Sequence, residues 1–79
     1  MSNHTYEFEA LFYKRLGNEL LAMREMHGRS QDFIARQIGV TNQQYHKYER
    51  GIARMPLHRF ILLTKYYKVS PMVFLDGLV

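Results

Sequence analysis

The sequence has no cysteine and no long apolar run, and each absence removes a class of protein. Without cysteine, neither a disulfide framework nor a thiolate metal site can supplement the core, and an extracellular role loses its usual support. No apolar stretch approaches the roughly 20 residues that a membrane span requires. Residues 1–10 lack the charged and apolar regions of a secretory signal. We therefore expect a soluble, cytoplasmic protein that has no membrane segment.

Side chains that usually build catalytic or metal sites are present but scattered. The four histidines have neither the spacing nor the neighbouring cysteines and paired carboxylates of a metal site. The sequence contains no glycine-rich phosphate loop and no nucleophile with a plausible base. We therefore expect a protein that is not an enzyme and that uses neither a cofactor nor a metal.

The 79 residues predict a single small domain with a simple core, and their net charge of +4 is unevenly distributed. Residues 29–68 carry eight bases against two acids, whereas residues 1–28 carry three bases against four acids. Such a basic region is the electrostatic footprint of polyanion binding. The alternative is a solvated surface that has no partner.

Apolar spacing predicts an all-α chain of five helices without strands. In the first helix, which should end near Gly28, apolar residues recur every three or four positions at Phe8, Leu11, Phe12, Leu16, Leu20 and Met23. Gly17 interrupts this pattern, and an interior glycine costs about 1 kcal/mol relative to alanine, so the segment is either one helix with a weak point or two pieces that meet there. We favour one continuous helix. Residues 1–15 form an N-terminal extension that could pack on the domain or on a second subunit.

Residues 30–50 predict two short helices joined by a tight turn. Ser30 can cap the first of them, and Gly39 ends it. Thr41 can cap the second helix, where Gln44 completes a T-x-x-Q capping box. Gln44 therefore has a structural alternative to any contact with a ligand.

Two further helices should complete the domain. The fourth helix is expected to hold Pro56 in its first turn, and its inward residues are predicted to be Phe60, Leu63, Thr64 and Tyr67. Ser70 and Pro71 then open a short last helix with the apolar residues Val73, Phe74 and Leu75.

One side of the third helix carries groups that suit base recognition. The residues predicted to be exposed are Asn42, Gln43, Gln44 and Lys47. Tyr45 and Tyr48, three positions apart, would share the inward face. An amide can bond both a donor and an acceptor of adenine, and lysine can bond guanine. This helix is therefore suited to reading bases in a DNA groove.

The sequence resembles the phage repressor and Cro type of helix-turn-helix protein, also called xenobiotic-response-element-like (XRE), whose fold is lambda-repressor-like. The resemblance covers roughly residues 16–77. It rests on LGNELLAMREMHGRSQ, IARQIGVTNQQYHKYERG and KVSPMVFLDG, together with Arg54 before the fourth helix. Two departures are Arg29, where the family usually has an apolar residue, and the tyrosines at positions 45 and 48. Either tyrosine ring could therefore lie at the DNA-facing rim and not in the core.

The resemblance also implies roles for individual residues. Base-reading residues would be Asn42, Gln43 and Lys47, with Gln44 as a further candidate. Phosphate contacts would come from Gln31, Thr41, Arg50 and Arg54. From its position between the base-reading residues, His46 could contact phosphate or base, although a lone histidine there is more often a solvated surface residue. Arg24 and Glu49 would form a structural salt bridge, the alternative being two separate surface charges.

These inferences favour a sequence-specific regulator of transcription that binds double-stranded DNA, most simply a small repressor acting as a homodimer. Two recognition helices about 34 Å apart can reach successive major grooves of a two-fold-related operator. An antitoxin with a toxin partner and a protein-interaction module of the same fold are alternatives. A basic amphipathic peptide lying on a membrane is a weaker one.

Overall fold

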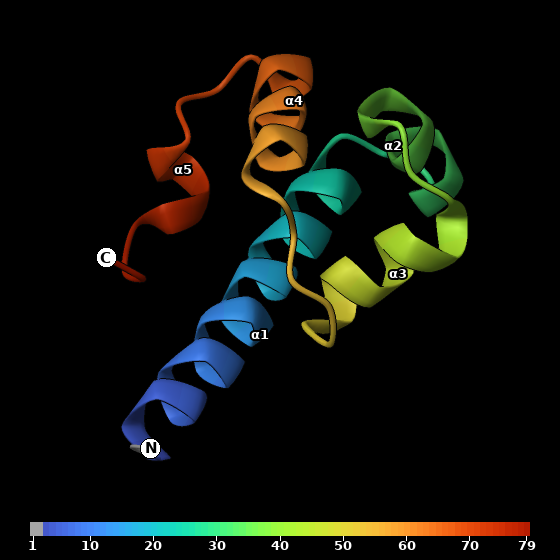
Figure 1. Cartoon of the computed structure of the whole chain (residues 1–79). Coiled ribbons are helices and arrows are strands. Elements are labelled where there is room, and N and C mark those ends of the chain that lie inside the picture. The colour runs from blue at the N-terminus through green and yellow to red at the C-terminus, as the bar shows by residue number, and fades with distance from the viewer. Residues whose placement is uncertain (1–2) are drawn as a thin grey trace.

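A computed structural model describes residues 3–79 as five helices, and the described part contains no strand (Figure 1). The helices are α1 (Asn3–Met26), α2 (Gln31–Ile38), α3 (Asn42–Arg50), α4 (Leu57–Tyr67) and α5 (Met72–Leu75). This confirms the all-α prediction. No helix within residues 3–79 is long and apolar enough to cross a membrane.

Helix α1 is the long axis around which the other helices are arranged. Its C-terminal half lies among α2, α3 and α4, whereas its N-terminal turns project beyond the body of the domain (Figure 1). The α2–α3 pair and α5 lie on opposite sides of α1 in this view. The domain thus has a helix-turn-helix side and an opposite side, formed by α5 and the projecting end of α1.

The core receives side chains from all five helices and from the loop before α4. Its buried hydrophobic residues are Leu16, Leu20, Met23, Ile34, Ala35, Ile38, Tyr45, Tyr48, Met55, Phe60, Leu63, Tyr67 and Phe74. All four inward residues predicted for α4 are buried, including Thr64. Pro56 does not lie in the first turn, as predicted, but immediately precedes the helix, because its extended backbone ψ of 145° is not helical.

The predicted apolar stripe of α1 is only partly covered by the rest of the chain. Leu16, Leu20 and Met23 are buried as expected, and Phe12 is partly buried against the core. Phe8 and Leu11 remain 63% and 52% exposed, because α1 has passed beyond the other helices at that point. The prediction of one inward stripe therefore holds only for its C-terminal half.

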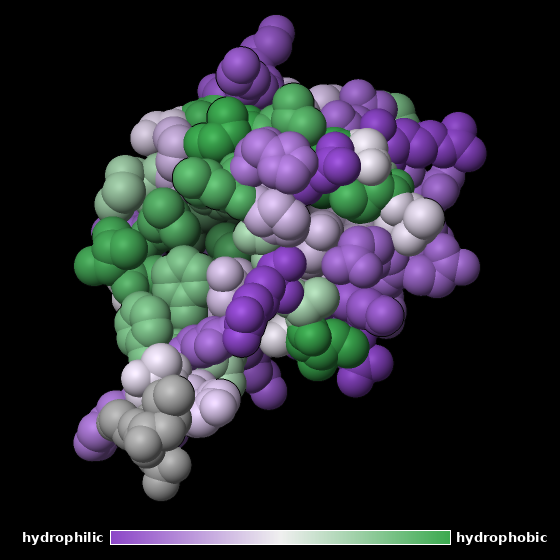
Figure 2. Space-filling view, viewed as in Figure 1, coloured by the Kyte–Doolittle hydropathy of each residue, from purple (hydrophilic) through white to green (hydrophobic). Residues whose placement is uncertain are grey.

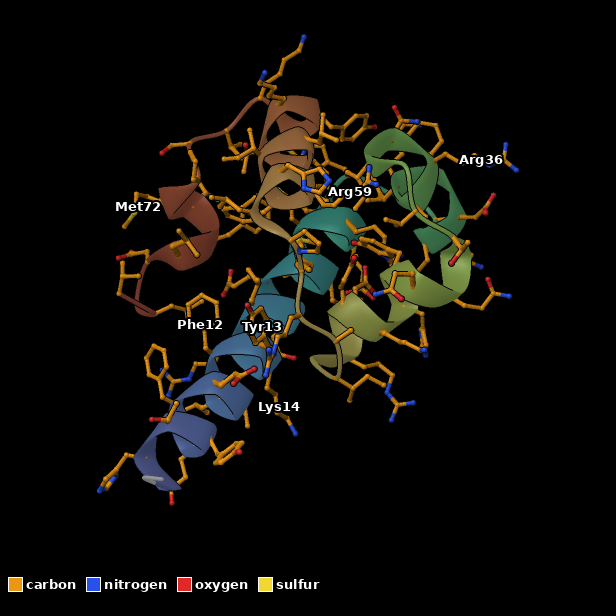
Figure 3. All side chains as sticks on the ribbon, viewed as in Figure 1. Phe12, Tyr13, Lys14, Arg36, Arg59 and Met72 are labelled. Atoms are coloured by element: carbon orange, nitrogen blue, oxygen red, sulfur yellow. The ribbon has the colours of Figure 1, made fainter. Side chains whose placement is uncertain are left out.

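Two glycines allow α1 and α3 to touch backbone to backbone. A Cβ atom on Gly17 would lie 2.7 Å from the Tyr48 carbonyl oxygen, and one on Gly51 would lie 2.6 Å from Lys14 Cα. Figure 3 shows Lys14 where α1 passes the end of α3. The single α1 helix confirms the prediction of continuity, but Gly17 is not a weak point. It is the position at which a side chain would push α3 away.

The ends of α2 and α3 follow the predicted capping residues. The Ser30 and Thr41 hydroxyls accept hydrogen bonds of 3.1 Å from backbone N–H groups three residues later. Gly39 and Gly51 end the two helices with positive φ values of 75° and 72°. These local signals fix the turn between the helices and hence the direction of α3.

Candidate nucleic-acid interface

Five polar or cationic side chains share the exposed side of α3. They are Asn42, Gln43, His46, Lys47 and Arg50, and we call them the front of α3. A shallow groove beside this helix is lined by most of these side chains, with Gln31 from α2 and Ile52 from the following loop. Amide, imidazole and ammonium groups therefore face solvent together, which is the donor and acceptor set that base edges require.

The opposite side of α3, its rear, is fixed in the core. Tyr45 and Tyr48 are both buried, and their rings meet edge to face with centroids 6.5 Å apart. Such a contact contributes about 0.5–1.5 kcal/mol beyond the area buried. The alternative that either ring lies at the exposed rim is therefore wrong. The tyrosines anchor the helix from behind.

A buried carboxylate joins three helices at the end of α3. Glu49 accepts hydrogen bonds of 2.6 Å from Arg24 Nε and 3.0 Å from Arg24 Nη2, a bidentate pairing. Gln31 Nε2, at the start of α2, donates a third bond of 2.9 Å to Glu49. Arg24 also donates to the Arg29 carbonyl oxygen at 2.8 Å. Thus α1 holds α3 and the entry to α2 through one cluster of polar groups.

The cluster determines the protonation of Glu49. Burial alone would raise the pKa of this carboxyl, but the hydrogen bonds from Arg24 and Gln31 outweigh burial and lower it below its usual value. The same bonds favour the charged form, so Glu49 is ionised at neutral pH. Glu49 and Arg24 are not separate surface charges, because the carboxylate is only 7% exposed.

The two tyrosines nearest this cluster carry buried hydroxyls. Neither the Tyr45 nor the Tyr67 hydroxyl makes a hydrogen bond of ordinary geometry within the described chain. Burial raises the pKa of Tyr67 to about 12, and burial together with the nearby Glu49 carboxylate raises that of Tyr45 still further. Both phenols therefore stay neutral and belong to the core.

Gln44 differs from the other predicted base-reading residues. It is half-buried, and it does not line the groove with its neighbours. Gln44 is two positions along the chain from Asn42 and from His46, and two positions correspond to a rotation of roughly 200° around an α-helix. The Thr41 hydroxyl accepts its backbone N–H, so Gln44 belongs to the first turn of α3. The expectation that it shares the exposed side with Asn42 and Gln43 is wrong for this reason.

His46, in contrast, lies within the front of α3 between the predicted base-reading residues. Its imidazole is exposed and one turn from both Asn42 and Arg50. The structure therefore places it as close to a ligand in the groove as the amides. Thr41 and Arg50, the expected phosphate contacts at the two ends of α3, are also exposed.

The predicted phosphate contact Arg54 already has an acidic partner. Its guanidinium forms an ion pair with the Glu9 carboxylate, which projects from the N-terminal part of α1. The two residues are 45 positions apart, so no local sequence signal could have predicted this pair. A phosphate group would have to compete with Glu9 for Arg54.

Two other residues near the interface were missed by sequence reasoning. Ile52 is 65% exposed beside the polar front, where its apolar side chain helps to line the groove. Arg59 crosses from α4 to the end of α2 and donates a 2.8 Å hydrogen bond to the Ile38 carbonyl oxygen (Figure 3). It braces the turn before α3 and leaves the front of that helix open.

Two exposed arginines lie at α2: Arg29, the departure from the family pattern, shortly before the helix, and Arg36 within it. The guanidinium of Arg29 lies 4.5 Å from the centroid of the Phe33 ring, a cation–π contact that covers the ring. Arg36 pairs with Asp32 one turn earlier and points away from the body (Figure 3). Among residues 3–79, no group of three acidic, histidine or cysteine side chains is placed to hold a metal ion.

The sequence of this chain is similar to that of known proteins. A family model described as Helix-turn-helix matches residues 20–74, which include α2, the turn, α3 and α4. The chain belongs to this XRE-type helix-turn-helix family. Residues 3–15 lie outside the matched region. No solved structure shows a significant match to the chain.

One curated relative supports the same assignment. The chain is 36% identical over 61 residues to an uncharacterized HTH-type transcriptional regulator, y4wC, of Sinorhizobium fredii (strain NBRC 101917 / NGR234). The aligned region covers 77% of this chain and 43% of the relative, so the chain spans less than half of that protein. The family model and the relative thus agree that residues 20–74 form a helix-turn-helix domain.

Proposed function

We propose that this chain binds double-stranded DNA in a sequence-specific manner by placing the front of α3 in the major groove. The observation that carries the proposal is the division of α3 into an exposed polar side and a buried side. Because Tyr45, Tyr48 and Glu49 are fixed in the core, the helix can present its front as a rigid unit. A rigid presentation lowers the entropic cost of binding.

The front divides into two groups by chemistry. Asn42, Gln43, His46 and Lys47 would contact base edges, whereas Gln31, Thr41 and Arg50 would contact phosphates on either side. Phosphate contacts fix the register of a protein on the duplex, and base contacts select the sequence. The Gln31 amide also donates to Glu49, so one residue would connect the phosphate backbone with the buried cluster.

We further propose a small repressor that acts in the cytoplasm as a homodimer on a two-fold-related operator. A single α3 has nine residues and can read only a few base pairs. Two copies with their recognition helices about 34 Å apart would double the length of the site. Occupation of an operator within a promoter would then exclude polymerase.

Salt dependence tests whether the chain binds DNA. Affinity for random duplex should fall steeply with salt, because each neutralised phosphate contributes a slope of about 0.9 to the log–log plot. Selection of bound sequences from a random duplex pool would then give the preferred site. A flat salt dependence, or no binding at low salt, would contradict the proposal.

Two substitutions test the division between base and phosphate contacts. Gln43→Ala should weaken binding to the selected site by about 1–3 kcal/mol and leave binding to random duplex nearly unchanged. Arg50→Ala should weaken binding to both duplexes alike and reduce the salt slope. Identical behaviour of the two variants would show that the assignment of roles is wrong.

A DNA-binding antitoxin is the second candidate within this family. Exposed apolar side chains on α1 and α5 provide a surface that a toxin could cover. This role predicts a small toxin gene beside the gene for this chain, and co-expression of the two products should yield a stable complex. A chain that forms a stable complex only with itself favours the repressor.

A further inference from the structure

The projecting end of α1 exposes large apolar side chains that the family does not explain. We call residues 3–15 the arm; they precede the family match, which begins at residue 20. Phe8 and Leu11 are 63% and 52% exposed although they lie in a regular helix. The Phe8 and Phe12 rings are 5.9 Å apart at their centroids, which makes the apolar surface continuous along the arm.

This surface continues onto the C-terminal segment. Phe8, Leu11 and Phe12 line a shallow depression together with Leu78. Met72 and Val73 of α5 are also about half exposed. Figure 2 shows the resulting hydrophobic area on the side of the molecule formed by α5 and α1, and Figure 3 shows Met72 projecting on that side. Contiguous exposed apolar areas of this kind mark interaction sites.

The charges beside the apolar residues indicate what covers them. Glu7 and Arg15 lie four residues before and four residues after Leu11, so both lie close to it on one side of the helix. Both are exposed, and neither forms an ion pair with another residue in the described part of the chain. Glu7 thus stands at one end of the surface and Arg15 at the other, where Glu19 and Asp76 line a depression beside Arg15. A surface with this symmetry of opposite charges is complementary to itself.

We propose that the arm is a homodimerisation element, in which the arms of two copies cross antiparallel about a two-fold axis at Leu11. The crossing places Glu7 of one copy opposite Arg15 of the other, twice by symmetry. Phe8, Leu11 and Phe12 of both copies become buried between the helices. The C-terminal segment with Met72 and Leu78 covers the edge of this contact.

The arrangement is compatible with simultaneous use of α3. Helix α5 lies on the opposite side of α1 from the helix-turn-helix pair (Figure 1), and Phe8, Leu11 and Phe12 line a depression with Leu78. A second copy on this face of the arm would therefore leave the front of α3 free. Glu9 and its partner Arg54 border the proposed contact, since they line one depression with Phe8 and Phe12 and another with the loop after α3. The inference deepens the proposed function and rests on it for the biological role of the dimer.

A charge exchange tests the antiparallel crossing. Sedimentation equilibrium should show a dimer for the 79-residue chain, and Glu7→Arg or Arg15→Glu alone should weaken self-association at least about tenfold. A mixture of the two single variants should recover the dimer, because each heterodimer restores both opposite-charge contacts. Circular dichroism melts verify that the variants fold. The control is Glu25→Arg, which lies on α1 outside the arm and should leave self-association unchanged.

Several results would overturn the proposal. They are a monomeric parent chain, single variants that associate as tightly as the parent, and a mixture that gains nothing over its components. A complex formed only with a different protein would assign the surface to a heterologous partner instead. DNA binding is measured as a separate readout. A variant made monomeric by Leu11→Arg should bind random duplex with an unchanged salt dependence, but it should bind the two-fold-related site less tightly than the parent chain does. Loss of all DNA binding in a dimeric parent chain would contradict the proposed function and leave the arm contact intact.

Discussion

The two sides of α3 differ more than any other pair of surfaces in this domain. The rear contains two buried tyrosines and a carboxylate with three hydrogen bonds from two other helices. The front contains exposed amides, an imidazole and cations whose side chains form none of the hydrogen bonds or ion pairs that hold residues 3–79 together. One helix thus separates stability from recognition, and substitutions should affect one property or the other.

The largest effect is expected on the rear of α3, at Glu49. Glu49→Ala removes the acceptor of Arg24 and Gln31 and leaves a partly buried cation without an anionic partner. We expect the free energy of unfolding to fall by about 3–5 kcal/mol. Urea unfolding followed by circular dichroism measures the loss, and Glu25→Ala on the exposed side of α1 is the matched control. A loss no greater than that of the control would mean that the cluster does not hold the helices together.

A smaller loss is expected where α1 touches α3. Gly17→Ala would stabilise a free helix, but here the added methyl group meets the Tyr48 and Glu49 carbonyl oxygens. Overpacking of this kind costs about 1–3 kcal/mol. Gly17→Ala should therefore lower the melting temperature, whereas Asn18→Ala, at an exposed neighbouring position, should raise it. Equal stabilisation by both substitutions would show that the two backbones are not in contact.

Acid should weaken the same rear contacts without a mutation. Because the pKa of Glu49 is lowered in the folded state, the unfolded chain binds more protons near pH 4.5, the ordinary value. The contribution of Glu49 to stability is therefore complete above that pH and is lost as the pH falls through the folded-state pKa. Urea unfolding at a series of pH values should show that the free energy of unfolding falls less steeply below pH 4.5 for Glu49→Gln than for the parent chain. Equal slopes for the two proteins would contradict this account.

The smallest effect is expected beside the front, at the pair of Glu9 and Arg54. Glu9→Gln frees Arg54 from its ion pair and removes a negative charge near the DNA. Exposed pairs are worth about 0.2–1 kcal/mol, so affinity for duplex should rise by a comparable amount. Fluorescence anisotropy at low salt measures the affinity for duplex, and Glu25→Gln is the control for the loss of one negative charge. Unchanged or weaker binding would show that Arg54 is not a phosphate contact.

The parts of the fold that sequence reasoning predicted depend on neighbouring residues. Ser30, Thr41, Gly39 and Gly51 determine the ends of α2 and α3 through bonds that span only a few positions. These local preferences are strong enough to be read from the sequence. The fold class and the buried side of α4 were also predictable, because both follow from the helical spacing of apolar residues.

What could not be predicted depends on contacts between distant segments. Gly17 appeared to be a weak point because only the folded chain brings the end of α3 against it. Glu9 and Arg54 meet for the same reason. The exposure of Phe8 and Leu11 depends on where the other helices end, which periodicity does not encode. Gln44 was expected to be exposed because its amide suited the expected chemistry, but it is half-buried.

The most direct test of the front of α3 is an NMR titration of the labelled chain with its selected duplex. The side-chain amide groups of Asn42 and Gln43 should show the largest shift changes, while the ring signals of Tyr45 and Tyr48 stay nearly constant. Shift changes concentrated on the arm or α5, with the Asn42 and Gln43 amides unchanged, would contradict the claim that α3 reads DNA.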